Sequence, residues 1–311
     1  MSKPMRKTTI GGQALIEGLL MRGPDKLAAV IRKSDGEYEI KEESVKPEKE
    51  KNAFLRAPFI RGAVNFVEMM KVGISYLSYS AEVSGGEDYE PDKLDMWIEK
   101  KFGKEKAEKL VITVAMILGV GFSVLLFILL PTLLVGAFSK LTDSGILRNL
   151  IEGGLRICIF LAYLWLVSNM KDMQRLFAYH GAEHKTIFCY EAGAGLTVEN
   201  VRGFKRQHPR CGTSFLFIVM IISILVFSFV SWSNPFIRMA LRIALLPVVV
   251  GISYEISRAV GRHDNPFTRF LRAPGLLLQN LTTREPDDDM IEVAIEALTR
   301  VVPEDKNSDR W

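Results

Sequence analysis

Two of the four histidines in this 311-residue chain stand in one short stretch, His180-Gly-Ala-Glu183-His184. In a helix each residue turns by about 100°, so both imidazoles and the Glu183 carboxylate would lie on one side. Two histidines four positions apart can share one metal ion, and the order H-x-x-E-H is that of the inverted zincins. The pattern therefore predicts a divalent metal of the zinc type, with Glu183 as the general base.

A catalytic metal needs a third protein ligand and one open position. His208 and Cys211 follow in the same loop, just before a long apolar stretch. Either could complete the site with His180 and His184, because both ends of the loop would lie at one membrane face. Alternatively, His208 belongs to a basic surface and Cys211 packs as a small apolar residue. If all four side chains bound the ion, the site would be closed and structural.

Other polar residues are weaker candidates. Glu255 could bind the metal or orient a ligand, or it could pair with Arg258 on the next helical turn. Glu17 lies in a glycine-rich segment that could fold back over the site. His263 and Asp264 could act as a histidine and its orienting carboxylate, although adjacent residues seldom face each other.

The composition indicates a membrane protein with soluble parts. The residues are 48% hydrophobic and 24% charged, and the mean hydropathy is +0.14. This is too apolar for an ordinary soluble protein and too charged for a wholly embedded one. Three cysteines cannot all pair, so no disulfide framework is expected. No apolar segment follows the basic N-terminus, so no cleaved signal peptide is expected.

Four apolar stretches are each long enough for a membrane helix of about 20 residues. They are residues 111–138, 147–169, 212–232 and 235–253. We expect kinks at Pro131 and Pro247. The fold class is therefore a mainly α polytopic bundle of four spans over residues 110–260, with a His/Cys loop at 170–211.

The ends of the chain are expected to form a cytoplasmic α+β portion. Region 1–109 should hold a β-hairpin, because 27–32 and 37–41 flank Ser34-Asp35-Gly36. Residues 61–81 have apolar side chains at helical spacing, which fits a helix packed on this sheet or lying in the membrane interface. The tail, 261–311, should hold a soluble amphipathic helix.

Basic residues are concentrated in the His/Cys loop and the tail, whereas the loops after the first and third stretches hold few. The positive-inside rule therefore places both termini and the His/Cys loop in the cytoplasm. Anionic lipid at the inner face explains these charges better than nucleic acid does. No phosphate-binding loop or dinucleotide-binding glycine pattern is present.

Charged residues also occur inside the predicted spans. Glu152 and Arg156 are one turn apart in the second, and Arg238 and Arg242 in the fourth. Charge within a bilayer is costly, so such residues are usually paired or functional. We interpret them as an ion cluster that joins the two spans, with a transport path as the alternative.

Four segments carry a family resemblance. GGQALIEGLLMRGP from Gly11, HGAEHKTIFCYE from His180, HPRCGTSFL from His208 and PGLLLQNLTTREPDDDMIEVAIEAL from Pro274 resemble the DUF1385 family, also called YqhQ-like proteins. The resemblance extends over nearly the whole chain. It implies a bacterial multi-pass membrane protein that is a predicted metal-dependent enzyme, and it supplies no substrate.

These observations predict a metal-dependent hydrolase at the cytoplasmic face of the bacterial cell membrane. Its substrate would be a peptide, a membrane protein or a lipid-linked molecule near the membrane surface. A non-catalytic scaffold with a structural metal site is the main alternative. A transporter is a second alternative, which only the charged residues within the predicted spans support.

Overall fold

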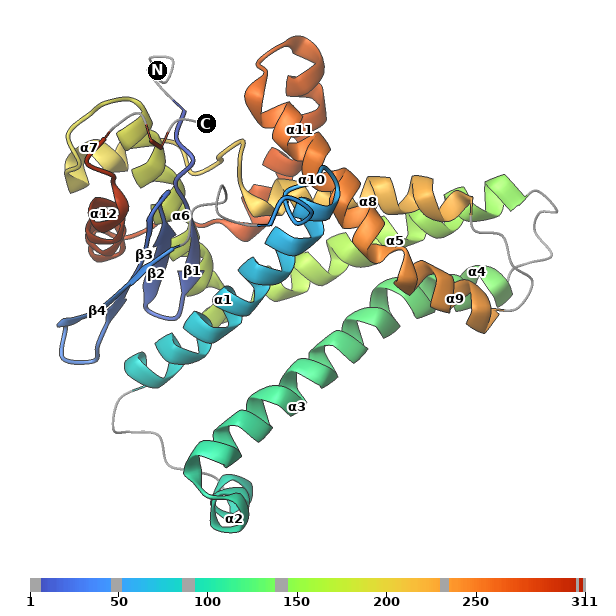
Figure 1. Cartoon of the computed structure of the whole chain (residues 1–311), viewed down its shortest axis with the longest axis horizontal. Coiled ribbons are helices and arrows are strands. Elements are labelled where there is room, and N and C mark those ends of the chain that lie inside the picture. Colours follow the sequence, from blue (N-terminus) through green and yellow to red (C-terminus); the bar gives the residue numbers. More distant parts are fainter. Residues whose placement is uncertain are drawn as a thin grey trace. The chain divides into compact units, whose positions relative to one another are not determined.

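The computed structural model describes residues 7–45, 52–85, 93–137, 145–229, 235–305 and 308–309. The chain is mainly helical, with a small antiparallel sheet near the N-terminus (Figure 1). It forms two compact units. The first unit comprises Met1–Gly86, Leu164–Ser223 and Leu245–Trp311, and the second unit comprises Glu87–Tyr163 and Ile224–Ala244. Both ends of the chain and the His/Cys segment thus belong to the first unit.

The sheet has four antiparallel strands in sequence order. They are β1 (Gly11–Leu15), β2 (Gly18–Arg22), β3 (Lys26–Arg32) and β4 (Tyr38–Ser44). The predicted hairpin is confirmed, because Arg32 pairs with Tyr38 and Gly36 adopts a φ of 88° in the connecting loop. The glycine-rich segment before it forms a second hairpin, β1–β2, which the sequence analysis did not predict.

Helices cover both faces of the sheet (Figure 1). Ala28 and Val30 of β3 pack against α6 (Lys171–Glu191) and α12 (Asp288–Val301), whereas Ala29 and Ile31 pack against α1 (Ile60–Ser84). Because both faces are buried, β3 is a continuous apolar run. The helix predicted at 61–81 is confirmed, and it packs on the sheet.

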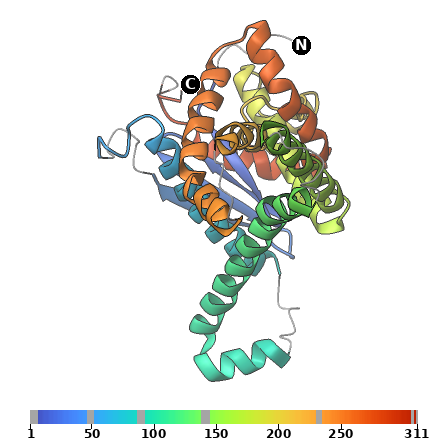
Figure 2. The same cartoon turned by 90° about the vertical axis from the view of Figure 1, so that its right-hand side faces the viewer.

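The other helices of the chain are α2 (Lys93–Phe102), α3 (Lys104–Val124), α4 (Leu130–Ala137), α5 (Gly145–Ser168), α7 (Val198–Arg202), α8 (Gly212–Ser228), α9 (Pro235–Ala244), α10 (Leu246–Arg262) and α11 (Pro266–Thr282). Figure 2 shows the sharp bend between α2 and α3, where Gly103 adopts a φ of 78°. A positive φ of this kind is readily adopted by glycine.

Within the part of the chain that the structure describes, three helical segments are long and apolar enough to cross a membrane. They are Leu110–Gly136, Leu147–Ser168 and Ile237–Arg262. The third predicted stretch forms α8, a shorter apolar helix. A π-helical turn, Leu125–Leu129, precedes Pro131, and Pro247 lies in the first turn of α10. The last segment continues past residue 253 to Arg262, so Glu255 and Arg258 lie inside it.

Candidate metal centre

Helix α6 carries the central residues of the site. It begins just after α5 ends at Ser168, and it packs on β1 and α12. The predicted helical conformation of the H-x-x-E-H stretch is confirmed, with Glu183 and His184 buried. Gly181 allows the tail to approach closely, because a Cβ there would lie 2.1 Å from the Arg284 carbonyl oxygen. The segment around Arg284 in the C-terminal tail therefore packs directly on this side of α6.

Cys211 lies against the two histidines of α6. The Nε2 atom of His180 is 3.2 Å from Cys211 Sγ. One potential ligand atom from each of His180, His184 and Cys211 lies within 4.8 Å of the others. Cys211 comes immediately before α8. The two histidines therefore come from α6, and the cysteine comes from the residue that precedes the next apolar helix. Thiolate and imidazole are the ligands that zinc favours.

Main-chain carbonyls orient both imidazoles. His180 Nδ1 is 2.8 Å from the Thr282 carbonyl oxygen, and His184 Nδ1 bonds to the carbonyl oxygen of Arg206. A carbonyl only accepts hydrogen bonds, so each Nδ1 must donate its proton. Nε2 is then the nitrogen of each ring that can bind an ion, once any proton on it has left. Metal-binding histidines are commonly oriented in this way.

Buried polar contacts hold the loop that supplies Cys211. The side-chain amide of Gln279 accepts a hydrogen bond from the His208 N–H at 2.7 Å and donates one to the His208 carbonyl at 2.8 Å. Arg206 Nη1 donates to the Thr283 carbonyl at 3.1 Å. Gln279 and Thr282 were not among the residues predicted for the site. The available signal was a set of polar residues on the otherwise apolar segment LLLQNLTT.

Glu183 is enclosed beside the two histidines. Its Oε1 atom accepts a hydrogen bond from the Gly12 N–H at 2.9 Å, and the residue is 5% exposed. A Cβ on Gly12 would lie 2.7 Å from the Leu20 carbonyl oxygen and 3.2 Å from Glu183 Cδ. Burial raises the pKa of Glu183 above its ordinary value, although both histidines oppose this effect. A carboxyl with a raised pKa is suited to general acid–base catalysis.

Cys211 and His180 favour each other's charged forms. Burial opposes ionisation of Cys211, yet His180 and His184 hold the pKa of its thiol well below the ordinary value. Burial likewise opposes protonation of His180, yet the Cys211 sulfur raises the pKa of His180 to about 9. The Thr213 N–H also donates to Cys211 Sγ at 3.4 Å. The thiolate is the form of cysteine that binds metal.

His208 has a different set of partners. Its Nε2 atom is 3.6 Å from Oε2 of the buried Glu191, and its ring centroid is 5.6 Å from that of His184. Glu191 also binds Arg210 and accepts the Thr8 N–H at 2.7 Å. Burial lowers the pKa of His208 to about 4. The structure thus brings Cys211 to the two histidines and His208 to Glu191.

Glu17 and Glu255 bind arginines. Glu17 lies in the turn between β1 and β2 with a φ of 51°, and its Oε2 is 2.5 Å from Arg175 Nη2 on α6. The glycine-rich segment therefore folds back onto α6, but the group that reaches Glu183 is the Gly12 N–H. Glu255 pairs with Arg61 of α1 at 2.5 Å.

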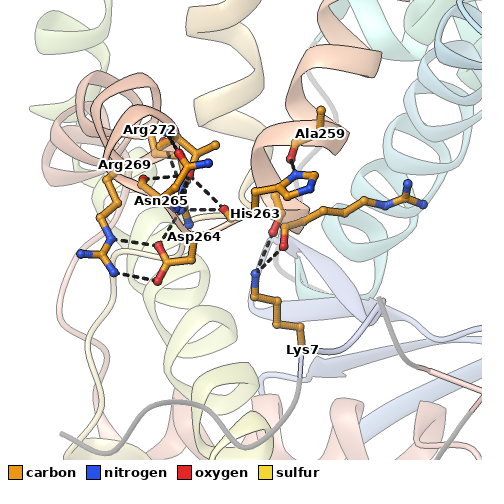
Figure 3. A network of polar contacts seen from close by, with 10 residues as sticks. Lys7, Ala259, His263, Asp264, Asn265, Arg269 and Arg272 are labelled. Carbon is orange, nitrogen blue, oxygen red and sulfur yellow. Dashed lines mark hydrogen bonds and ion pairs between the residues drawn. The ribbon is translucent and has the colours of Figure 1, made fainter.

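His263 and Asp264 do not bond to each other. His263 Nδ1 lies 3.0 Å from the Ala259 carbonyl, whereas Asp264 binds Arg269 at 3.0 Å and Arg272 at 2.9 Å (Figure 3). The Lys7 ammonium group donates to the Gly261 carbonyl at 3.0 Å in the same network. These contacts fix the connection between α10 and α11.

In the second unit, Glu152 links three helices. Its carboxylate on α5 binds Arg242 of α9, accepts the Thr132 hydroxyl of α4 at 2.8 Å, and lies 3.2 Å from Arg156 Nη2. The structure therefore places three of the four predicted intramembrane charges in one cluster. Arg238 is one turn from Arg242, and its buried Nε has no hydrogen-bond partner among the described residues.

Comparison with known proteins identifies the family. The sequence model described as "Protein of unknown function (DUF1385)" matches residues 57–304. The "Uncharacterized protein YqhQ" of Bacillus subtilis (strain 168) is 34% identical over 303 residues, which cover 97% of this chain and 95% of that protein. No solved structure matches the chain. With most of its length matched both by the family model and by this relative, the chain belongs to the DUF1385 family.

Proposed function

We propose that this protein is a metal-dependent hydrolase of the bacterial cell membrane, with a zinc-type divalent ion held by His180, His184 and Cys211. Glu183 would move a proton between water and the substrate. The substrate would be a peptide, a membrane protein or a lipid-linked molecule near the inner membrane face. Lipid, including anionic lipid at that face, would surround the spans.

One observation carries this proposal: both histidines donate Nδ1–H to main-chain carbonyls, and Cys211 Sγ lies 3.2 Å from His180 Nε2. This arrangement fixes which nitrogen of each ring can bind an ion. Three protein ligands leave a fourth position for water or substrate, which is typical of catalytic zinc sites. The buried Glu183 carboxyl, with its raised pKa, provides an acid–base group beside them.

We further propose that α8 is a fourth span and that both termini are cytoplasmic. Helix α6 begins directly after the membrane-length helix α5, and Cys211 directly precedes α8. Both connections of the site would therefore run into the membrane from one side. The basic residues of the His/Cys loop support the cytoplasmic side. Labelling of single introduced cysteines at residues 45 and 195 in intact cells, with a membrane-impermeant maleimide in a Cys158→Ser, Cys189→Ser, Cys211→Ser background, should give no signal until the cells are opened.

Metal analysis tests the site directly. Purified wild-type protein should contain about one zinc-type ion, and a His180→Ala, His184→Ala double variant should lose it. His263→Ala is the matched control, because His263 bonds to Ala259 outside the group. Wild-type protein without metal after growth in zinc-supplemented medium would refute the site, as would equal occupancy in the double variant.

Replacement of zinc by Co²⁺ separates a catalytic site from a structural one. A thiolate ligand should give a charge-transfer band that is absent in Cys211→Ser. Added azide should change the visible spectrum if a coordination position is open. An unchanged spectrum would favour the non-catalytic scaffold, because a closed four-ligand site has no room for a further ligand.

The contact between Cys211 Sγ and His180 Nε2 at 3.2 Å also favours a second candidate, a cysteine-dependent acyl transferase or hydrolase. A thiolate beside an imidazolium is an activated nucleophile. In this case iodoacetamide would modify Cys211 rapidly in metal-free protein, and a His180→Ala variant would react much more slowly near neutral pH. Protection of Cys211 by added zinc would favour the metal site.

A further inference from the structure

The apolar helices of the second unit contain an excess of positive charge. Glu152 is the sole acidic residue within positions 110–137, 145–163, 224–229 and 235–244. Arg156, Arg238 and Arg242 lie within the same positions, on α5 and α9. Unbalanced charge is costly in an apolar environment, so such clusters usually have a counter-ion. This imbalance does not depend on the proposed metal site.

Two of these arginines converge on one carboxylate. Arg242 binds both oxygens of Glu152, and Arg156 reaches Oε1 of the same group at 3.2 Å. Both guanidinium groups also lie 5.5 Å from the centroid of the Phe227 ring. A single carboxylate therefore neutralises half of the charge of this pair, and the two like charges remain close together.

Arg242 retains hydrogen-bonding capacity in this buried environment. The residue is 2% exposed, and its Nε atom has no hydrogen-bond partner among the described residues. The buried Nε of Arg238, one turn away on α9, is also without one. A buried donor without an acceptor is costly, so an acceptor at this position would stabilise the cluster.

A small pocket lies beside Arg156 and Arg242. It is lined by Asn149, Glu152, Arg156, Phe227, Ser228 and Arg242. The pocket has room for about one water-sized atom, so it can admit a single oxygen of a larger anion. Guanidinium groups bind phosphate oxygens well, because their planar donors match the geometry of the anion.

We propose that this pocket binds an oxygen atom of a phosphate group, which would balance the charge of Arg156 and Arg242. The phosphate group is either that of a phospholipid or free inorganic phosphate. The amide of Asn149 lines the pocket beside the arginines and would provide an uncharged contact.

Thermal unfolding of the full chain in an uncharged detergent tests the proposal. The probes are dioctanoyl phosphatidylglycerol, its phosphate-free counterpart dioctanoylglycerol, and inorganic phosphate. Dioctanoyl phosphatidylglycerol should raise the Tm saturably, whereas dioctanoylglycerol should not. A response to inorganic phosphate as well would identify free phosphate as a sufficient ligand. A response to the phospholipid alone would identify the lipid headgroup.

Variants test the position of the site. Arg156→Gln should require about tenfold or more phosphatidylglycerol for the same shift, as expected for loss of one charged hydrogen bond. Lys100→Gln, an exposed charge change on α2, should respond as wild type does. If Arg156→Gln does not fold, Arg156→Lys should show a weakened response. Equal shifts with dioctanoylglycerol, equal responses of the wild type and the Arg156 variant, or no shift with either phosphate probe would overturn the proposal.

Discussion

Gln279 forms two hydrogen bonds to the main chain of His208, through its Oε1 and Nε2 atoms, and thereby joins the end of α11 to the loop that supplies Cys211. Gln279→Ala would leave the buried N–H of His208 without its acceptor and would remove one of the two donors to the His208 carbonyl, which also accepts the Cys211 N–H at 3.4 Å. Each unsatisfied buried group costs about 1–3 kcal/mol, so the Tm should fall clearly. Apparent zinc affinity should also fall, by about 10–100-fold, as is typical when groups that orient metal ligands are lost.

Gln207→Ala is the control for this prediction. Gln207 is a partly exposed neighbour in the same loop, and its side chain bonds to Asn280 at 2.8 Å. The variant should unfold and bind zinc much as wild type does. If Gln279→Ala matched Gln207→Ala in both measurements, Gln279 would have no role in positioning the loop.

Gly12 and Gly11 provide a matched pair at the start of β1. A Cβ on Gly12 would lie 2.7 Å from the Leu20 carbonyl oxygen, whereas one on Gly11 would have no atom within 4 Å. Gly12→Ala should therefore cost about 1–3 kcal/mol, the usual range for overpacking, and displace the N–H that binds Glu183. Gly11→Ala should leave the Tm nearly unchanged. Equal Tm values for the two variants would contradict the close approach of β1 to α6.

Glu152→Gln removes the one carboxylate between Arg156 and Arg242. Loss of one partner from a buried ion pair typically costs about 3–5 kcal/mol, because charge is left uncompensated. We expect a large fall in Tm and in the yield of folded protein from membranes. Glu99→Gln, on the exposed side of α2, should behave as wild type does. A Glu152→Gln variant as stable as Glu99→Gln would show that the cluster does not stabilise the second unit.

The pairing of Glu17 with Arg175 should make stability sensitive to acid. Burial opposes ionisation of Glu17, but Arg175 holds the pKa of its carboxyl below the ordinary 4.5. A lowered folded-state pKa contributes stability that is complete above pH 4.5 and is lost as the pH falls towards the folded value. The Glu17→Gln variant should therefore have a lower Tm than wild type near neutral pH. Its Tm should also fall less than that of wild type when the pH is lowered. Parallel Tm-against-pH curves for the two proteins would reject this contribution.

The placement of three candidate residues on one helix could be predicted from the sequence because their spacing is local. The positions of His180, Glu183 and His184 on α6 follow from the helical repeat alone. Cys211 was identified together with His208 because both belong to the same loop. His208 contacts Glu191 and Gln279, which both lie outside the short segment 208–211, and no local sequence pattern encodes such contacts.

The fold was predictable to a similar degree. The Ser34-Asp35-Gly36 hairpin has a strong turn signal, whereas the β1–β2 hairpin turns at Ile16-Glu17, where Glu17 rather than a glycine adopts the positive φ. The extension of α10 to Arg262 was missed because Tyr254, Glu255 and Arg258 interrupt the apolar run. Arg61, which binds Glu255, lies on α1 and carries no sequence signal of that pairing.

The acceptors for the two histidine rings come from opposite sides of α8 in the sequence: Arg206 before it and Thr282 near the end of the chain. Ribosomal synthesis proceeds from the N-terminus, so α6 emerges well before Thr282 and Gln279 have been made. His180 can therefore adopt its final ring orientation only when translation is almost complete. A chain that ends before residue 279 would lack both the acceptor for His180 and the amide that holds the main chain of His208.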